Sequence, residues 1–130
     1  MARFEPSCET IWHEENAVDD LFLKIIDREI PADIVYEDDN VVGFRDINPQ
    51  APTHVLFIPR RRIPTLNDLK PNDAALTGQL VLAAAAYAKQ IGVDEDGYRV
   101  VMNCNAAAGQ TVFHIHLHML AGRNMNWPPG

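Results

Sequence analysis

The sequence predicts an α+β fold, with a five-stranded, mainly antiparallel sheet and two principal helices. Short apolar segments bounded by turn-forming residues predict the strands, and two segments with apolar residues at helical spacing predict the helices. A chain of 130 residues, with 47% apolar and 22% charged residues, is long enough to bury one core. We therefore expect a single domain over residues 19–130, preceded by an irregular leader over residues 1–18 that shows no sustained period.

The first half of the domain is expected to hold one short helix and three strands. The helix begins at Asp19 or Asp20 and ends at the Ile30-Pro31 pair, because proline restricts the residue before it. Alternation and turn residues then predict a hairpin around Asp38-Asp39-Asn40 and a further strand that Pro59 closes. The three predicted strands cover residues 34–37, 41–46 and 54–58.

The second half of the domain is expected to begin with a long helix over residues 71–91. Pro71 suits the first turn of this helix, and Gly92 suits its C-terminal cap, because glycine readily adopts a left-handed conformation. The alanine run over residues 83–86 permits close approach of a neighbouring element. Two strands, over residues 98–103 and 112–120, complete the predicted sheet.

Charge and composition exclude several classes of function. The formal net charge of −7 argues against a duplex nucleic-acid surface, and the one basic run, Arg60-Arg61-Arg62, is expected in a solvated loop. Cys8 and Cys104 have the spacing of neither a zinc site nor a redox pair. No apolar run approaches membrane-spanning length, and no signal segment is recognised, so we expect a cytoplasmic protein with reduced thiols.

The segment from His114 to Leu120 carries most of the functional information. Its histidines, His114, His116 and His118, alternate with apolar residues, and residues two apart on a strand face the same side. One face of the predicted strand is therefore imidazole and the other is core. The preceding small residues and Gly109 could bring backbone N–H groups close to an anion.

Three interpretations of this strand compete. Three packed histidines without a function would bring polar burial and mutually unfavourable charges, which disfavours a purely structural role. A metal site is the second interpretation, because imidazole is a common zinc ligand, although a fourth ligand and a Glu base are missing from the motif. In the third, the imidazoles surround a phosphate and one of them attacks phosphorus. The approach through Gly109-Gln110-Thr111 favours the phosphate site.

The chain resembles the histidine triad (HIT) superfamily, and within it the histidine triad nucleotide-binding (Hint) branch. The His-φ-His-φ-His-φ-φ signature is matched by residues 114–120, and the resemblance extends over about residues 19–130. It implies a HIT-like fold that pairs into a ten-stranded dimeric sheet. The other matching segments are Lys24-Ile25-Ile26, Glu29-Ile30-Pro31-Ala32, residues 44–54 and the closing Trp127-Pro128-Pro129-Gly130.

The resemblance assigns catalytic roles. It implies that His116 attacks the α-phosphorus of a nucleoside monophosphate derivative, forming a nucleotidyl-histidine that water hydrolyses. His118 is expected to contact phosphate oxygens, whereas His114 and His54 orient the nucleophile. Thr111 stands where relatives usually have Ser and is expected to protonate or hydrogen-bond the leaving group. Histidines and backbone donors supply the charge stabilisation, so the expected mechanism requires no metal or cofactor.

The resemblance also implies a nucleotide pocket. The Asp46 carboxylate would accept hydrogen bonds from both ribose hydroxyls, although a turn residue is the alternative role. Asn103 and the backbone of Gly109, Gln110 and Thr111 would hold the phosphate; Asn103 could instead cap its strand. An apolar slot would enclose the base without strong discrimination, so purine preference comes from the resemblance alone. The residues of that slot are Leu21, Phe22, Ile30, Phe44 and Ile47.

The resemblance implies hydrolysis of purine nucleoside phosphoramidates, such as adenosine monophosphate linked to a lysine amine, with acyl-adenylates as further expected substrates. Two alternatives remain open: a dinucleoside polyphosphate hydrolase, and a nucleotide-responsive interaction module with little catalysis. The partners implied are purine nucleoside monophosphate derivatives and a second copy of the chain, towards whose leaving-group side Trp127 would reach. Bacterial relatives carry a zinc-binding cysteine pair around Phe22 and Leu23; its absence here predicts no zinc.

Overall fold

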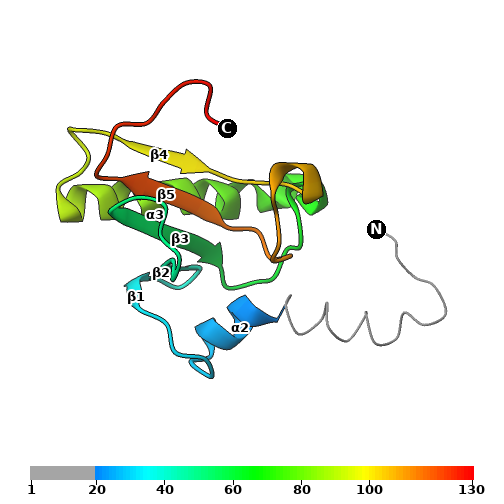
Figure 1. Cartoon of the computed structure of the whole chain (residues 1–130). Coiled ribbons are helices and arrows are strands. Elements are labelled where there is room, and N and C mark those ends of the chain that lie inside the picture. The colour runs from blue at the N-terminus through cyan, green and yellow to red at the C-terminus, as the bar shows by residue number, and fades with distance from the viewer. Residues whose placement is uncertain (1–19) are drawn as a thin grey trace.

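The computed structural model describes residues 20–130 and contains the predicted five-stranded sheet. The strands lie in the order β1-β2-β3-β5-β4, and every neighbouring pair is antiparallel (Figure 1). The predicted α+β class is thus confirmed, whereas the leader predicted for residues 1–18 lies outside the described residues. The elements are α2 (Leu21–Ile26), β1 (Ile34–Glu37), β2 (Val41–Arg45), β3 (Thr53–Pro59), α3 (Ala74–Ile91), β4 (Tyr98–Val101) and β5 (Leu117–Ala121).

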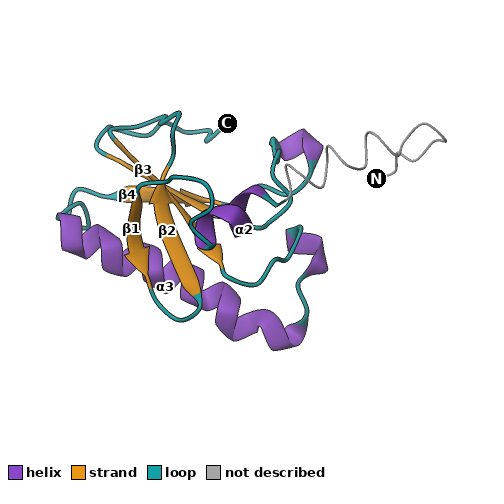
Figure 2. Cartoon of the chain, turned by 90° about the horizontal axis from the view of Figure 1, so that it is seen from below, coloured by secondary structure: helices purple, strands orange, loops and turns teal. Residues whose placement is uncertain are grey.

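The long helix α3 covers one face of the sheet. Figure 2 shows this helix running along the sheet. Alternating residues of β3 and β5 contribute to the core beneath it, because apolar side chains two residues apart on a strand face the same side. Gly92, with a φ of 77°, ends the helix in the left-handed conformation that the sequence predicts. Core residues on this side include Val55, Phe57, Leu80, Ala84, Tyr87, Ile115, Leu117 and Met119.

The short helix α2 packs against the opposite face, next to the N-terminal half of the sheet. Phe22 and Ile25 are buried there because they lie three residues apart and so share one side of the helix. They contact a second apolar cluster formed by the other alternate residues of β2 and β3. Its members are Val42, Phe44, Leu56 and Ile58.

Four predicted elements need correction. Helix α2 ends at Ile26 and not at the Ile30-Pro31 pair, because Arg28 adopts a left-handed conformation with a φ of 62°. The fifth strand was expected over residues 112–120, but β5 begins only at Leu117, so His114 and His116 precede it. Their backbone is diverted from the sheet, since the Ile115 amide donates to the Ile63 carbonyl at 2.8 Å. The predicted helix over residues 71–91 likewise begins with a separate 3-10 turn over Pro71–Asp73 before α3. The predicted fourth strand is shorter, because β4 ends at Val101.

Strands β2 and β3 approach closely at Gly43. A Cβ atom added there would lie 2.8 Å from Cε1 of Phe57 and 3.1 Å from Cβ of Tyr36. Gly43 is therefore required by packing rather than by an unusual backbone conformation.

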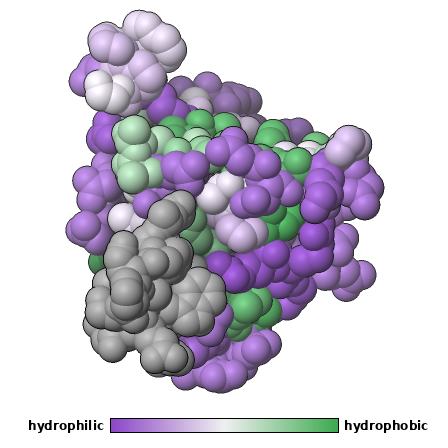
Figure 3. All heavy atoms as spheres, turned by 90° about the vertical axis from the view of Figure 1, so that its right-hand side faces the viewer, coloured by the Kyte–Doolittle hydropathy of each residue, from purple (hydrophilic) through white to green (hydrophobic). Residues whose placement is uncertain are grey.

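The surface is mainly hydrophilic on the face that Figure 3 shows, with hydrophobic residues in smaller separate patches. Among the described residues, no helix has the length and apolar character needed to cross a membrane. The basic run has intramolecular partners: Arg60 pairs with Glu37, Arg61 with Asp73, and Arg62 donates to the Phe113 carbonyl.

Candidate active site

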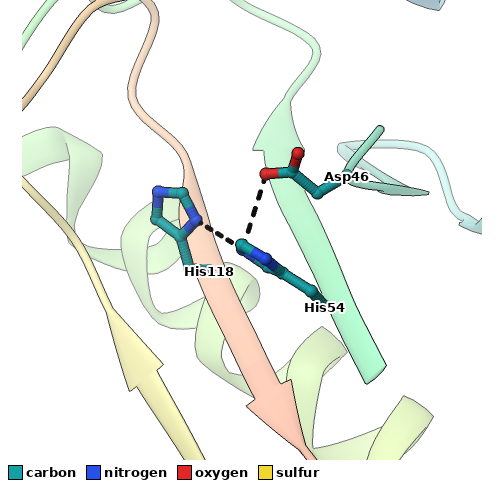
Figure 4. Close-up of side chains that lie close together, drawn as sticks. All are labelled: Asp46, His54 and His118. Atoms are coloured by element: carbon teal, nitrogen blue, oxygen red, sulfur yellow. Dashed lines mark hydrogen bonds and ion pairs between the residues drawn. The ribbon is translucent and has the colours of Figure 1, made fainter. Parts of the chain in front are cut away.

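Three polar side chains from separate strands meet on the α2 side of the sheet. His54 lies on β3, His118 on the adjacent β5, and Asp46 directly follows β2. Figure 4 shows the His54 ring between the Asp46 carboxylate and the His118 ring. Nε2 of His54 lies 2.9 Å from Nδ1 of His118 and 3.5 Å from Oδ2 of Asp46. The antiparallel registers therefore bring together residues up to 72 positions apart in the sequence.

The backbone fixes the protonation of the His54–His118 pair. The Gln50 amide donates a hydrogen bond to Nδ1 of His54 at 3.0 Å, so this nitrogen carries no proton. In a neutral ring the proton of His54 must then lie on Nε2, which donates it to Nδ1 of His118. Nδ1 of His118 is consequently an acceptor, and its Nε2–H remains as a donor for a ligand.

The other two histidines are fixed in the same way by carbonyl oxygens. Nδ1 of His116 lies 2.8 Å from the His114 carbonyl, and a carbonyl only accepts, so this nitrogen carries the proton. Nε2 of neutral His116 therefore bears a free lone pair. Nε2 of the fully buried His114 donates to the Pro59 carbonyl at 2.7 Å, which leaves its Nδ1 without a partner among the described residues.

Burial keeps the four imidazoles neutral. Desolvation lowers the pKa of His116 and of His54 below the ordinary value, and the nearby Asp46 charge opposes this shift. Burial lowers the pKa of His114 to about 4, against the effect of its hydrogen bond to Pro59. The pKa of His118 also falls to about 4, first through burial and then through the charges of His116 and His54. At neutral pH the site thus holds uncharged rings.

The same cluster contains the atoms that a metal ion would need. One ligand atom each from Asp46, His54 and His118 lies within 4.8 Å of the others. Such nitrogen and carboxylate ligands suit zinc, but the two nitrogens already share a hydrogen bond at 2.9 Å. A metal ion would have to replace the proton in that bond.

The loop before the histidines is held by one buried side chain. Oε1 of Gln110 accepts from the Asn105 amide at 2.8 Å, and its Nε2 donates to the carbonyls of Pro64 and Val112. Gly109 adopts a φ of 91°, which favours glycine, and Thr111 is exposed. The Gln110 side chain thus has a structural position, while the backbone of Gly109 and Thr111 stays near the surface.

Helix α2 connects the predicted base slot to the histidines. The Phe22 ring packs edge-to-face on His116 and His114, with centroid distances of 5.1 and 5.5 Å, and on Phe44 at 5.5 Å. Leu21 and Ile30 pack half-buried against the same cluster. Ile47, the last residue predicted for the slot, is 99% exposed instead and makes no such contact.

A cavity of about 430 Å³ opens beside the His54–His118 pair, under the C-terminal tail. Asn103 lines the same cavity as these histidines, whereas Trp127 is 81% exposed. Two arginines, Arg99 and Arg123, also line this cavity.

Sequence reasoning missed three of the residues found here. Gln50 acts through its backbone amide, which no residue type could reveal. Arg99 was detectable, because it alternates with Val101 and Asn103 along the predicted fourth strand and so shares their face. Arg123 lies in the tail beyond the sheet, where periodicity carries no signal.

The chain is similar in sequence to named proteins over most of its length. It is 54% identical to the purine nucleoside phosphoramidase of Escherichia coli, over 82% of this chain and 90% of that protein. It is 51% identical to a maize protein named 14 kDa zinc-binding protein, over 85% of this chain and 87% of that protein.

Solved structures agree with these sequence relationships. A HIT family hydrolase from Legionella pneumophila superposes with a TM-score of 0.83 at 52% identity, covering 85% of this chain and 98% of that one. The pattern that defines the HIT domain matches residues 27–125. The chain therefore belongs to the HIT domain family.

Proposed function

We propose that the chain hydrolyses purine nucleoside phosphoramidates to a nucleoside monophosphate and a free amine. The single observation that carries this proposal is the pairing of a nucleophile and a donor in one site. His116 presents a free Nε2 lone pair, and His118 presents an Nε2–H, with ring centroids 5.0 Å apart. The name and the 54% identity of the Escherichia coli enzyme support the substrate class.

In the first step, Nε2 of His116 attacks the α-phosphorus, a P–N bond to the ring forms, and the P–N bond to the amine breaks. The departing nitrogen receives a proton from solvent through the Thr111 hydroxyl. The His114 carbonyl accepts a hydrogen bond from Nδ1–H of His116 during the whole step. It thereby stabilises the positive charge that develops on the His116 ring. His118 donates Nε2–H to a phosphate oxygen.

In the second step, water attacks the nucleotidyl-histidine and breaks the bond to Nε2. One water proton returns to solvent, which balances the proton given to the amine, and His116 becomes neutral again. The same chemistry would release the carboxylate of an acyl-adenylate, since only the leaving group differs.

The elements that flank this centre would hold the nucleoside. Asp46 lies beside His54 with Oδ1 accepting from the Asn48 amide at 2.8 Å, and its Oδ2 would bind the ribose hydroxyls. Leu21, Phe22 and Ile30 would line the base slot, and the exposed Ile47 would cover the base. Asn103 and the backbone of residues 109–111 would contact the phosphate.

The nucleophile assignment is tested by His116→Ala and His116→Gly. Turnover of an adenosine phosphoramidate should fall by several orders of magnitude, because the attacking group is removed, while circular dichroism shows a folded chain. An alkaline quench of the wild type during turnover should reveal a nucleotidyl adduct by mass, and neither variant should form it. Near-wild-type turnover in a folded variant would exclude His116 as nucleophile.

A dinucleoside polyphosphate hydrolase is the alternative enzyme, and a nucleotide-responsive interaction module is the non-enzymatic one. A turnover screen of matched adenosine phosphoramidates and dinucleoside polyphosphates separates these three functions. Preferred cleavage of P–N bonds supports the proposal, and nucleotide binding without turnover of either class supports the interaction module.

We also infer a homodimer, because one edge of the described part carries exposed apolar residues. Val100 on the edge strand β4 is 40% exposed, and Leu82 on α3 is 68% exposed. Edge strands with free backbone groups are commonly paired or covered, and a two-fold copy would form a ten-stranded sheet. The exposed Trp127 would then reach the partner's leaving-group side.

A further inference from the structure

The cavity under the C-terminal tail contains two positive charges that the proposed chemistry does not use. Arg99 projects from β4 and Arg123 from the segment after β5, and both line the same cavity as His54 and His118. Its volume of about 430 Å³ is enough for a small organic group.

Neither guanidinium has a carboxylate partner within residues 20–130. Arg99 donates to the Asn126 carbonyl at 3.0 Å, and Arg123 donates to the carbonyls of Gln50 and Asn124 at 3.0 and 3.2 Å. A carbonyl hydrogen bond leaves the charge uncompensated, and each guanidinium retains further donors. By contrast, carboxylates pair with Arg28, Arg45, Arg60 and Arg61.

The register of β4 places the backbone of Arg99 one two-residue step from the position opposite His118. Val101 lies opposite His118, and Arg99 lies opposite Leu120, one two-residue step further along the same face. That step is roughly 7 Å on a strand. Asn103, the proposed phosphate contact, lies two residues beyond Val101 in the opposite direction. Asn103, Val101 and Arg99 therefore form one wall of the cavity.

We propose that this cavity is a leaving-group subsite that selects amines carrying a carboxylate several bonds from the reacting nitrogen. The inference rests on the proposed function and names its amine class: ω-amino carboxylates, including a lysine that is linked through its side-chain nitrogen. An extended six-carbon chain spans roughly 7–8 Å from nitrogen to carboxylate, which is comparable with the two-residue strand step from Val101, opposite His118, to Arg99. The carboxylate stays chemically unchanged during hydrolysis.

A pair of substrates that differ only in charge tests this subsite. Adenosine 5′-phosphoramidates of 6-aminohexanoate and of 6-aminohexanamide have the same length and the same reacting bond. The ratio of their kcat/KM values should exceed one in the wild type and should fall about tenfold in the double variant Arg99→Gln and Arg123→Gln. The control is Arg45→Gln, which removes an arginine paired with Asp33 and should leave the ratio unchanged.

The ratio separates charge recognition from displacement of the tail. Both arginines also hold backbone carbonyls, so a displaced tail would lower turnover of both substrates alike and leave the ratio intact. A wild-type ratio at or below one, or an unchanged ratio in the double variant, would overturn the proposal. The proposal would also be overturned if the double variant lost only the cleavage of diadenosine tetraphosphate, because the two arginines would then bind phosphate.

A binding measurement distinguishes failure of the subsite from failure of the proposed function. The Nε–H NMR signals of Arg99 and Arg123 are followed while 6-acetamidohexanoate is added to the wild type in the presence of adenosine monophosphate. They should shift with this carboxylate and remain still with its neutral amide, whether or not the chain turns over phosphoramidates. Equal shifts with both probes would contradict the subsite.

Discussion

At the scale of single residues, the site depends on which nitrogen of each imidazole carries the proton. Two carbonyl oxygens and one backbone amide determine this for His114, His116 and His54, and His54 then determines it for His118. Each partner is a main-chain group or another histidine of the set. The tautomers are therefore a property of the fold, and they hold while the rings stay neutral.

The first prediction concerns pH and the buried His114. Its folded pKa of about 4 lies below the ordinary 6.5, so the unfolded chain binds the proton more readily. Stability from this residue is complete above pH 6.5 and is lost as pH falls towards 4, by about 3 kcal/mol. Urea unfolding across this range should show the loss, and the His114 ring signals in NMR should titrate near pH 4. Titration of His114 near pH 6.5 would contradict it.

A second prediction concerns metal ions at Asp46, His54 and His118. The proposed attack uses a neutral imidazole and hydrogen-bond donors, so phosphoramidate turnover should be unchanged after exhaustive chelation. Elemental analysis of the purified protein should find no stoichiometric zinc. Chelator-sensitive turnover that zinc restores would instead assign the cluster to a catalytic metal, for which its ligand atoms are close enough.

At the scale of elements, the sequence was sufficient for the order of the helices and strands along the chain, but not for their ends, above all the start of β5. Alternation predicted a strand from residue 112, and burial does alternate from Ile115 onwards. The ladder begins later because Ile115 bonds to Ile63 and His116 bonds to the carbonyl of His114. Alternating burial indicates which face is apolar, whereas strand pairing depends on distant backbone that local sequence does not describe.

The candidate site also contains residues that the sequence reveals and residues that it does not reveal. The histidines and Asp46 were recognisable because their residue types and spacing match a family signature, and the structure brings His54, His118 and Asp46 together. Gln50 was not recognisable, because its contribution is a main-chain amide. The exposure of Ile47 was also beyond the sequence, since its apolar side chain alone predicts burial.

The third prediction concerns packing between the strands. Gly43→Ala places a methyl group 2.8 Å from the Phe57 ring and should lower the free energy of unfolding by about 1–3 kcal/mol. Gly78→Ala is the matched control, because nothing lies within 4 Å of its new Cβ on α3. Alanine should stabilise that helix by about 0.5–1 kcal/mol. Chemical denaturation of both variants measures the difference, and equal effects would contradict the packing argument.

At the scale of the whole molecule, the sheet has two edges, β1 and β4, and exposed apolar residues lie on the edge strand β4 and on α3. The exposed apolar residues are Tyr98 and Val100 on β4 and Val81, Leu82 and Ile91 on α3. A two-fold partner would bury them together.

The fourth prediction is that Leu82→Glu combined with Val100→Glu converts a dimer to a monomer. Burying these carboxylates at an apolar interface would be unfavourable, and the two copies would repel each other. Sedimentation equilibrium measures the mass, with Asn67→Glu as an exposed control outside β4 and α3. A wild-type chain that sediments as a monomer would refute the dimer.

The topology also bears on how the molecule folds. Strand β5 is the last in sequence, yet it lies inside the sheet between β3 and β4. β3 can pair with β2 beforehand, but β4 cannot join the sheet until the last strand enters between it and β3, and contacts between such distant segments form slowly. The His54–His118 bond spans 64 residues and closes only at that moment. A chain emerging from the ribosome would thus acquire its reactive centre as its final folding event, after most of its hydrophobic core has been synthesised.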